Sequence, residues 1–269
     1  FYFLLKQPMI IGDVLLAFTM YRYVKMRNMD RESWILRFWL LSPLNIILSG
    51  IWGMFDSLCM LFVVLALSSR NQTGRAVGSG LATFIKSIPI IYALPLALSG
   101  TKRLRGMIIA VGIPVFLSLA VLILTGWSLR EAYATLSSTV TKGGESLSAA
   151  DILFYLNRLG LVNDAQLGVM KPLAYAWIAA VLAATFVAFR KFGFRDDKSL
   201  VQSLLLCTLV FMIFRLQVNE QYTIYFFALA AIDVSIWNPG RRKILLASLV
   251  VVICYLVVNI PLLLRFVSP

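Results

Sequence analysis

The chain has 269 residues, of which 60% are hydrophobic and only 14% are charged, and it carries no histidine. An average soluble domain carries about 25% charged residues, and the charges here are too few to cover an aqueous surface. This composition excludes a soluble enzyme, a disulfide-stapled secreted module and a disordered tail. It predicts an all-α fold, a polytopic transmembrane helix bundle. The lack of histidine also excludes Ser-His-Asp catalysis and histidine-ligated metal sites.

The formal net charge is +13, a value that is also common among proteins that bind nucleic acids. The lysines and arginines, however, form short clusters between apolar runs, which is typical of loops on the cytoplasmic side of a membrane. We therefore expect a membrane as a partner and no nucleic acid. The 3 cysteines lie inside apolar runs and indicate neither a disulfide nor a metal site.

Apolar runs follow one another along the whole chain. A bilayer core of about 30 Å needs about 20 helical residues, so we interpret these runs as helices of a single transmembrane domain over residues 1–269. They lie at about 8–24, 35–51, 54–69, 76–98, 107–126, 172–189, 199–214, 223–237 and 244–264. The chain begins at Phe1 without methionine, and we expect a fragment that lacks an N-terminal portion. The expected location is the plasma membrane of a microbe, or the endoplasmic reticulum of a eukaryote.

The run at 76–98 differs from the others because Lys86 and Pro89 lie near its middle. Proline interrupts helical hydrogen bonds, and lysine is costly at mid-membrane depth. We predict a broken-helix hairpin whose halves, 76–85 and 88–98, enter and leave on one face, with Lys86 at the tip. This topology puts every short basic cluster on the cytoplasmic side, whereas a simple crossing divides them evenly between the two sides. The alternative is a kinked span whose lysine reaches the interface.

The same topology places the long polar segment 127–171 on the outer side. Ser148 and Asp151 are spaced as a helix-capping pair, and the apolar residues that follow share one helical face. We expect an interfacial helix lying on the outer membrane surface. A helix packed on neighbouring spans is the alternative. The shared face consists of Ile152, Tyr155, Leu156 and Leu159.

Three carboxylates occur at the outer ends of predicted spans, at Asp13, Asp56 and Glu220. Ionisable groups within a membrane are functional candidates because their burial is expensive. Three cations are expected at the same level, and together the six groups indicate a site. The alternative is a set of structural ion pairs, such as Asp13 with Lys6 or Glu220 with Arg215. The three cations are Lys6, Lys86 and Arg215.

Two predicted outer turns carry side chains suited to a carbohydrate. In SGIWGMFDS (residues 49–57), Trp52 can stack on a sugar ring and Asp56 can accept hydrogen bonds from hydroxyls. In VNEQY (residues 218–222), an amide, a carboxylate and a phenol supply both donors and acceptors. Aromatic residues alone are common at membrane interfaces, but the acidic residues in these turns are not explained by that tendency.

Four stretches in order along the chain resemble the glycosyltransferase-C superfamily, and most closely its microbial mannosyltransferase-like members. These integral membrane enzymes use polyprenyl-phosphate sugars. The stretches are KQPMIIGD (residues 6–13), SPLNIILSGIWGMFDS (residues 42–57), GLATFIKSIPIIYALPLAL (residues 80–98) and NEQYTIYFFAL (residues 219–229).

The resemblance implies inverting transfer of a hexose, most often mannose, from a polyprenyl-phosphate donor to a lipid-linked or glycan acceptor on the non-cytoplasmic face. The general base of such enzymes usually lies in a first outer loop, which would precede Phe1. Asp13 and Asp56 are weak candidates for that base here. We predict that Lys86 and Arg215 bind the donor phosphate. The predicted ligands of sugar or acceptor are Trp52, Asp56, Asn219, Glu220 and Tyr222.

No cofactor is firmly indicated, although Asp56 and Glu220 could hold a divalent cation through their oxygen atoms. The first alternative function is a secondary transporter or lipid flippase, because broken helices around charged cavities also occur in transporters. A transporter would place its site at mid-depth, whereas the polar turns here are expected at one side. The second alternative is a non-catalytic scaffold, which would not need converging polar turns.

Overall fold

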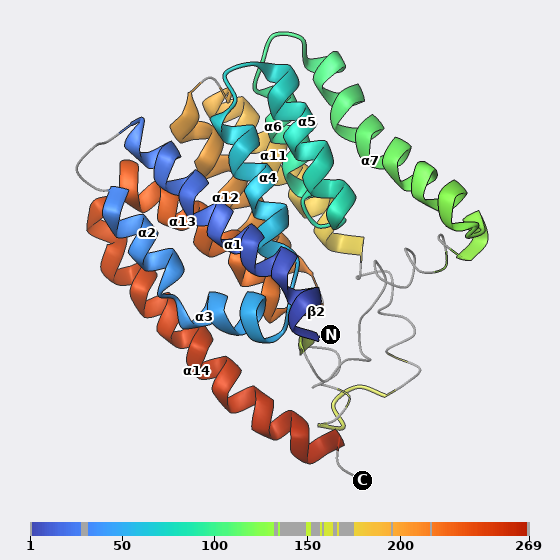
Figure 1. Ribbon diagram of the computed structural model, residues 1–269, viewed down its shortest axis with the longest axis vertical. Coiled ribbons are helices and arrows are strands. Elements are labelled where there is room, and N and C mark those ends of the chain that lie inside the picture. Colours follow the sequence, from blue (N-terminus) through green and yellow to red (C-terminus); the bar gives the residue numbers. More distant parts are fainter. Residues whose placement is uncertain are drawn as a thin grey trace.

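The computed structural model describes residues 2–27, 32–131, 149–151, 159–163, 175–194, 196–215 and 217–267, together with residues 134, 157 and 166. Within these residues the fold is a helical bundle with one short two-stranded sheet (Figure 1). The longer helices are α1 (Tyr2–Lys25), α2 (Glu32–Leu40), α4 (Asp56–Ser68), α5 (Gln72–Ile85), α6 (Ile90–Leu98), α7 (Arg103–Thr125), α11 (Ala176–Phe192), α12 (Asp197–Phe214), α13 (Thr223–Ile236) and α14 (Arg242–Val267). The short elements are α3 (Pro43–Asn45), the π-helix η1 (Ile46–Ile51), the 3₁₀-helices η3 (Glu220–Tyr222) and η4 (Pro239–Arg241), and the strands β1 (Ala149–Asp151) and β2 (Gln217–Asn219). The all-α expectation is confirmed.

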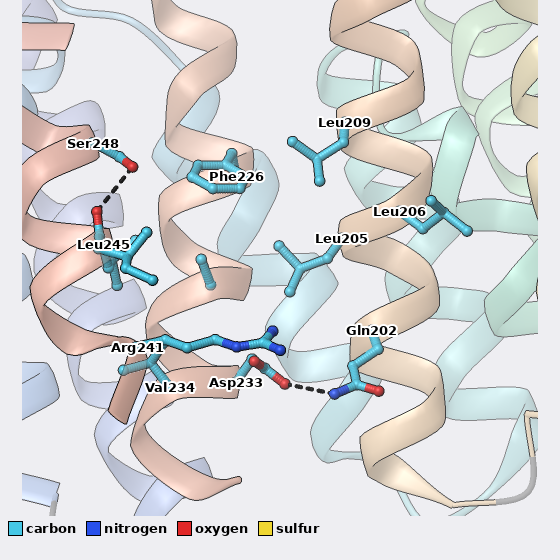
Figure 2. Close-up of a pocket in the computed structure, with 12 residues that line it drawn as sticks. Gln202, Leu205, Leu206, Leu209, Phe226, Asp233, Val234, Arg241, Leu245 and Ser248 are labelled. Carbon is cyan, nitrogen blue, oxygen red and sulfur yellow. Dashed lines mark hydrogen bonds between the residues drawn. The ribbon is translucent and has the colours of Figure 1, made fainter. Parts of the chain in front are cut away.

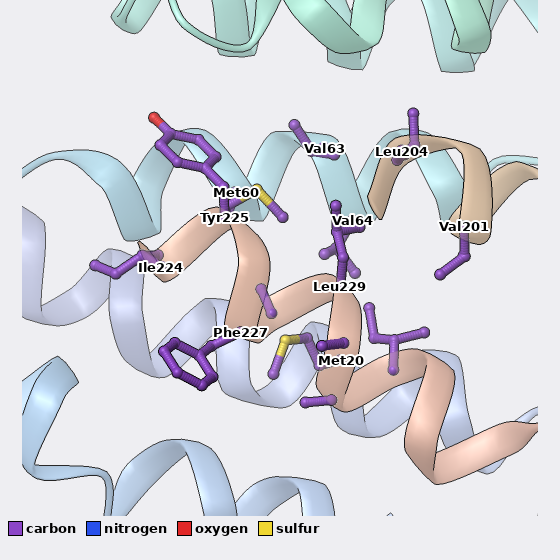
Figure 3. Packing of buried hydrophobic residues seen from close by; sticks show 14 of the residues in the cluster. Met20, Met60, Val63, Val64, Val201, Leu204, Ile224, Tyr225, Phe227 and Leu229 are labelled. Atoms are coloured by element: carbon purple, nitrogen blue, oxygen red, sulfur yellow. The ribbon is translucent and has the colours of Figure 1, made fainter. Parts of the chain in front are cut away.

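Helix α13 lies at the centre of the bundle and is buried along nearly its whole length. Its sequence is mainly apolar, with Asp233 as its one charged residue, as expected for a helix enclosed by others. Side chains of α1, α4 and α12 pack around it, among them Met20, Val64 and Leu204 (Figure 3). Because α13 starts directly after η3, this packing also determines where the preceding turn lies.

The predicted broken-helix hairpin is confirmed. Helix α5 ends where the backbone of Lys86 becomes extended (φ −151°, ψ 141°), and Pro89 then precedes α6 as its N-cap. Helix α6 returns beside α5 (Figure 1). The Gln72 side chain donates a hydrogen bond to the Ala97 carbonyl (2.7 Å) and accepts one from the Lys102 backbone N–H (2.8 Å). The start of α5 and the end of α6 therefore lie at the same end of the bundle, and Lys86 lies at the tip of the hairpin.

Close packing of the hairpin on α4 depends on Gly78. A Cβ atom at Gly78 would lie 2.9 Å from the Phe62 carbonyl oxygen and 2.9 Å from Cβ of Ala66. We expect Gly78→Ala to push α5 away from α4 and to reduce the free energy of unfolding by about 1–3 kcal/mol. Thermal unfolding of the purified protein in detergent measures this loss. Gly112→Ala on α7 is the control, since its Cβ would meet nothing within 4 Å; equal melting temperatures for the two variants would contradict the prediction.

One end of the bundle collects the basic clusters, and we call it the basic end. Asp197, at the start of α12, forms ion pairs there with Arg27 and with Arg75 (3.4 Å to Arg75). The termini of α1, α7, α11 and α14 bring further basic residues to the same end (Figure 1). This grouping agrees with the predicted topology, in which the clusters share the cytoplasmic side. The residues added by these termini are Arg22, Lys25, Arg103, Arg105, Arg190, Lys191, Arg242 and Lys243.

Asn71 belongs to an Asn-Gln-Thr glycosylation sequon at the basic end. Its side-chain oxygen caps α5 by accepting a hydrogen bond from the Gly74 N–H. If the basic end is cytoplasmic, Asn71 should carry no glycan in a eukaryotic host. Treatment with an N-glycosidase should then leave the mass of the protein unchanged. A mass decrease that disappears in Asn71→Gln would invert the predicted topology.

The helices of the structure vary in length more than the apolar runs of the sequence suggested. Among the described residues, α7 and α12 are long and apolar enough to cross a membrane, and the broken pair Ser33–Leu40 and Pro43–Ile51 could count as a third span. This pair is bent by 43°, because Pro43 starts a new helix within the run predicted at 35–51. Helices α4 and α13, with 13 and 14 residues, are shorter than a simple crossing.

Within residues 127–171, the structure differs from the predicted interfacial helix at Ala149–Asp151 and at Leu159. Ala149–Asp151 is a β-strand, so the expected helix does not begin at the capping pair of Ser148 and Asp151. The strand forms because Gln217–Asn219 offers it an antiparallel backbone partner. Leu159 lies in an exposed turn. The remaining residues of the predicted apolar face, Ile152, Tyr155 and Leu156, lie outside the described part of the chain.

Candidate active site

Opposite the basic end, the tip of the hairpin meets the start of α4. The Lys86 ammonium donates hydrogen bonds to both carboxylate oxygens of Asp56, each at 2.8 Å. The Asp56 side chain is fully buried, whereas 23% of the Lys86 side chain is exposed. An unpaired buried charge is strongly destabilising, so the charged Asp56 requires Lys86 as its partner. Asp56 thereby holds the Lys86 ammonium in one position, while part of the Lys86 side chain stays exposed.

The turn before α4 explains how Asp56 reaches this position. After η1 the chain turns at Gly53, whose φ of +69° favours glycine, and Asp56 then begins α4. A carboxylate in the first helical turn is favoured by the helix dipole. The Lys6 ammonium donates a hydrogen bond to the Ile51 carbonyl and fastens this turn to α1. The alternative pairing of Lys6 with Asp13 is not among the ion pairs of the described residues.

The segment between α12 and α13 brings a second cation to the same end. The centre of the Tyr222 ring is 5.4 Å from the Lys86 ammonium and 5.7 Å from the Arg215 guanidinium carbon. That carbon is also 5.2 Å from the Phe211 ring and 5.7 Å from the Trp177 ring. Attraction between a cation and an aromatic face orients the guanidinium. The site thus contains two cations in contact with one tyrosine.

Burial changes the proton affinities of the groups in this segment. It lowers the pKa of the Arg215 guanidinium, an effect that the neighbouring Tyr222 opposes. Burial raises the pKa of the Tyr222 phenol, while Arg215 acts in the opposite direction. An arginine side chain nevertheless stays protonated in proteins. Arg215 therefore presents a permanent positive charge to the site.

The other predicted ligands differ in the contacts that they make. Trp52 is half-buried and packs on the hydrophobic core. The Asn219 amide donates a hydrogen bond to the Tyr222 hydroxyl at 3.4 Å. The backbone carbonyl of Glu220 accepts a hydrogen bond from the Thr223 hydroxyl, which joins η3 to α13. The structure thus brings Asn219 and Tyr222 into direct contact.

Asp13 makes contacts of a different kind. One of its oxygens accepts hydrogen bonds from the Trp39 indole N–H (2.9 Å) and from the Ser57 hydroxyl (2.7 Å). The Ser57 hydroxyl is in turn 3.0 Å from that of Ser49. These bonds link α1, α2, η1 and α4 beside the Asp56 position. Asp13 thus stabilises the packing of these elements. Its role as a general base stays a prediction.

The β1–β2 ladder brings the outer segment back to the site. Ala149 lies opposite Asn219 and Asp151 lies opposite Gln217 in an antiparallel pair. Strand β2 leads directly into η3, which carries Glu220 and Tyr222. Residues of the segment predicted to be on the outer side are therefore placed next to the candidate sugar ligands.

Two aromatic residues of the site were not singled out from the sequence. Tyr225 is buried on α13 and lies beside Asp56. Trp177 borders Arg215, and its indole N–H has no hydrogen-bond partner within the described residues. Both occur in apolar helices, where an aromatic side chain looks like an ordinary core residue. For Tyr225, a signal was present in its spacing of three residues from Tyr222, which predicts a shared helical face.

The side chains of the candidate site do not form an obvious metal-binding site. Among the residues that the structure describes, no group of three or more histidine, cysteine, aspartate or glutamate side chains could hold a metal ion. A divalent cation between Asp56 and Glu220 would have to compete with Lys86 for both Asp56 oxygens. The possible cation thus stays a prediction.

Comparison with known proteins agrees with the membrane glycosyltransferase resemblance. The curated catalytic subunit of GPI alpha-1,4-mannosyltransferase I from Danio rerio is 32% identical over 142 residues, which cover 45% of this chain and 36% of the relative. The match thus spans about a third of that relative's own length. No solved structure matches the chain. The sequence pattern of glycosyltransferase family 87 matches residues 9–216, a range that includes Asp56, Lys86 and Arg215. This chain therefore belongs to glycosyltransferase family 87.

Proposed function

We propose that this membrane protein transfers a hexose, with mannose as the favoured sugar, from a polyprenyl-phosphate donor to a lipid-linked or glycan acceptor. Family membership supports sugar transfer, and the name of the Danio rerio relative supports mannose. The observation that carries the proposal is the meeting of Lys86 and Arg215 around Tyr222, at the end of the bundle opposite the basic end. With the basic end in the cytoplasm, transfer takes place on the non-cytoplasmic face of a plasma membrane or of the endoplasmic reticulum.

The two cations suit the leaving group of this reaction. An acceptor hydroxyl oxygen attacks the anomeric carbon, the bond from that carbon to the phosphate oxygen breaks, and the configuration inverts. The lipid phosphate gains a negative charge, which fixed cations stabilise better than mobile water. Lys86 is held by Asp56 and Arg215 by three aromatic rings, so neither has to reorganise as the charge develops.

The neighbouring side chains supply contacts for the sugar and the acceptor. Trp52 offers an aromatic face, while Asn219, Glu220 and Tyr222 offer hydrogen-bonding groups beside the two cations. Asp56 acts first by positioning Lys86, since both of its oxygens are occupied by the ammonium group. The hydroxyl proton must pass to a general base. Among the residues of this chain, Asp13 and Asp56 are the weak candidates for that base.

A transfer assay tests the proposal. Membranes that contain the protein are supplied with radiolabelled polyprenyl-phosphate mannose or glucose, and label is followed into the lipid and glycan fractions. We expect transfer from the mannose donor above the level of membranes without the protein. The proposal would be contradicted if neither donor supported transfer while the labelled lipid crossed the membrane of sealed vesicles. That result would support a flippase.

A further inference from the structure

A groove between α12, α13 and α14 lies near the basic end, on a different side of α13 from its contacts with α1 and α4. Its volume is about 440 Å³, within the range of about 300–1,000 Å³ of small-molecule sites. Leu205 and Leu209 on α12 form one wall, and Leu245 on α14 lies across the groove from them (Figure 2). The floor on α13 includes the small side chain of Ala230, which gives the groove its depth.

The polar end of this groove presents an arginine. Asp233 is buried (4% exposed), and its two oxygens accept hydrogen bonds from the amides of Gln202 (3.2 Å) and Asn238 (2.8 Å). The Arg241 side chain reaches across the same end (Figure 2) and is exposed. Within the described residues its guanidinium has no ion pair or hydrogen bond. The group offered at the mouth of the groove is therefore a cation.

The charges around the groove favour an anion at its mouth. Lys243, two residues after Arg241, is exposed, whereas Arg242 stacks on the Trp34 ring at 4.9 Å and faces α2. Asp233 also lines the groove, but its carboxylate is buried and both of its oxygens accept hydrogen bonds from amides, whereas Arg241 is exposed. Basic pockets between transmembrane helices at the cytoplasmic side commonly receive anionic lipid headgroups.

We propose that this groove binds an anionic glycerophospholipid of the bilayer. One acyl chain lies along the leucine walls, and the headgroup phosphate is bound by Arg241. This site is separate from the candidate active site, because the hairpin tip and η3 lie at the opposite end of α13 (Figure 1). The binding is therefore independent of the proposed sugar transfer.

Native mass spectrometry of the purified protein, delipidated and then titrated with lipid, tests the proposal. We expect phosphatidylglycerol to bind more tightly than phosphatidylcholine, and Arg241→Gln to weaken phosphatidylglycerol binding about fivefold, as expected for one basic residue at an anionic surface. Arg70→Gln is the matched control, since Arg70 is an exposed cation at the same end and away from the groove. Equal affinity of the two variants, or equal affinity of the two lipids for the unmodified protein, would overturn the proposal.

A second pair of variants tests the apolar part. Leu209→Trp should fill the groove and weaken binding of phosphatidylglycerol, whereas Ile213→Trp, one turn further along α12 and 73% exposed, should leave it unchanged. Melting temperatures show that both variants are folded. Unchanged binding in a folded Leu209→Trp variant would overturn the proposal. So would displacement of phosphatidylglycerol by an equal concentration of polyprenyl phosphate, which would assign the groove to the sugar donor.

Discussion

Lys86→Met should reduce the rate of sugar transfer by about 100- to 1,000-fold, the range found when one charge-stabilising donor is removed from an active site. The reason is that Lys86 contributes an ammonium fixed by two 2.8 Å bonds to Asp56. Its charge acts on the departing phosphate more than on the bound donor, so the loss should appear in kcat. The measurement is the initial rate of transfer from radiolabelled polyprenyl-phosphate mannose at saturating donor.

The single variant also leaves a buried carboxylate without a partner. Removing one member of a buried ion pair costs about 3–5 kcal/mol of stability, so loss of activity alone would be ambiguous. The double variant Lys86→Met, Asp56→Asn removes both charges and should recover most of the melting temperature while staying inactive. Lys86→Arg should retain part of the activity. Normal transfer by the folded double variant would eliminate Lys86 from the phosphate site.

Arg215→Gln should lower kcat/KM for the lipid-phosphate donor by about 10- to 100-fold, since a hydrogen bond to a charged group contributes about 1.5–3 kcal/mol. The guanidinium is held against Phe211, Trp177 and Tyr222, and the planar group suits both aromatic stacking and two-point binding of phosphate. Arg215→Lys keeps the charge without that shape, and its activity should lie between the two. Donor titrations with each variant provide the measurement.

The matched control is again Arg70→Gln, which removes one positive charge at the basic end. Its kcat/KM should equal that of the unmodified protein. If Arg70→Gln and Arg215→Gln reduced the donor kcat/KM equally, the effect of Arg215 would be one of net charge, and its direct contact with phosphate would be refuted. The Trp177→Leu variant adds a further check, because loosening the guanidinium should weaken donor binding without removing the charge.

The hairpin shows how much a local pattern can establish. A lysine and a proline in the middle of an apolar run are incompatible with a simple crossing, and the distribution of basic residues selected the hairpin over a kinked span. Structure and prediction agree that the chain breaks at Lys86 and Pro89. The same charge pattern predicted that the basic clusters share one end of the bundle.

Other features depended on partners far away in the sequence. Nothing near Asp13 indicates that it accepts hydrogen bonds from Trp39 and Ser57, and nothing near Lys6 indicates the Ile51 carbonyl as its partner. The strand at Ala149–Asp151 forms because β2 lies beside it, and this tertiary contact prevailed over the local capping pattern. Tyr225 and Trp177 were overlooked because composition does not distinguish a core aromatic from one that borders a charged group.

By itself, the sequence determined the membrane environment, the helical class, the hairpin and the polar residues available for a site. These properties follow from composition and local periodicity, in which each residue contributes through its own preference for water, lipid or helix. Only the tertiary structure decided which polar groups meet. The pairing of Asp56 with Lys86 and the aromatic surroundings of Arg215 arise from the packing of α4, α5, α11, α12 and α13. A buried charge needs a partner of opposite charge nearby. Which residue that partner is depends on how the helices pack.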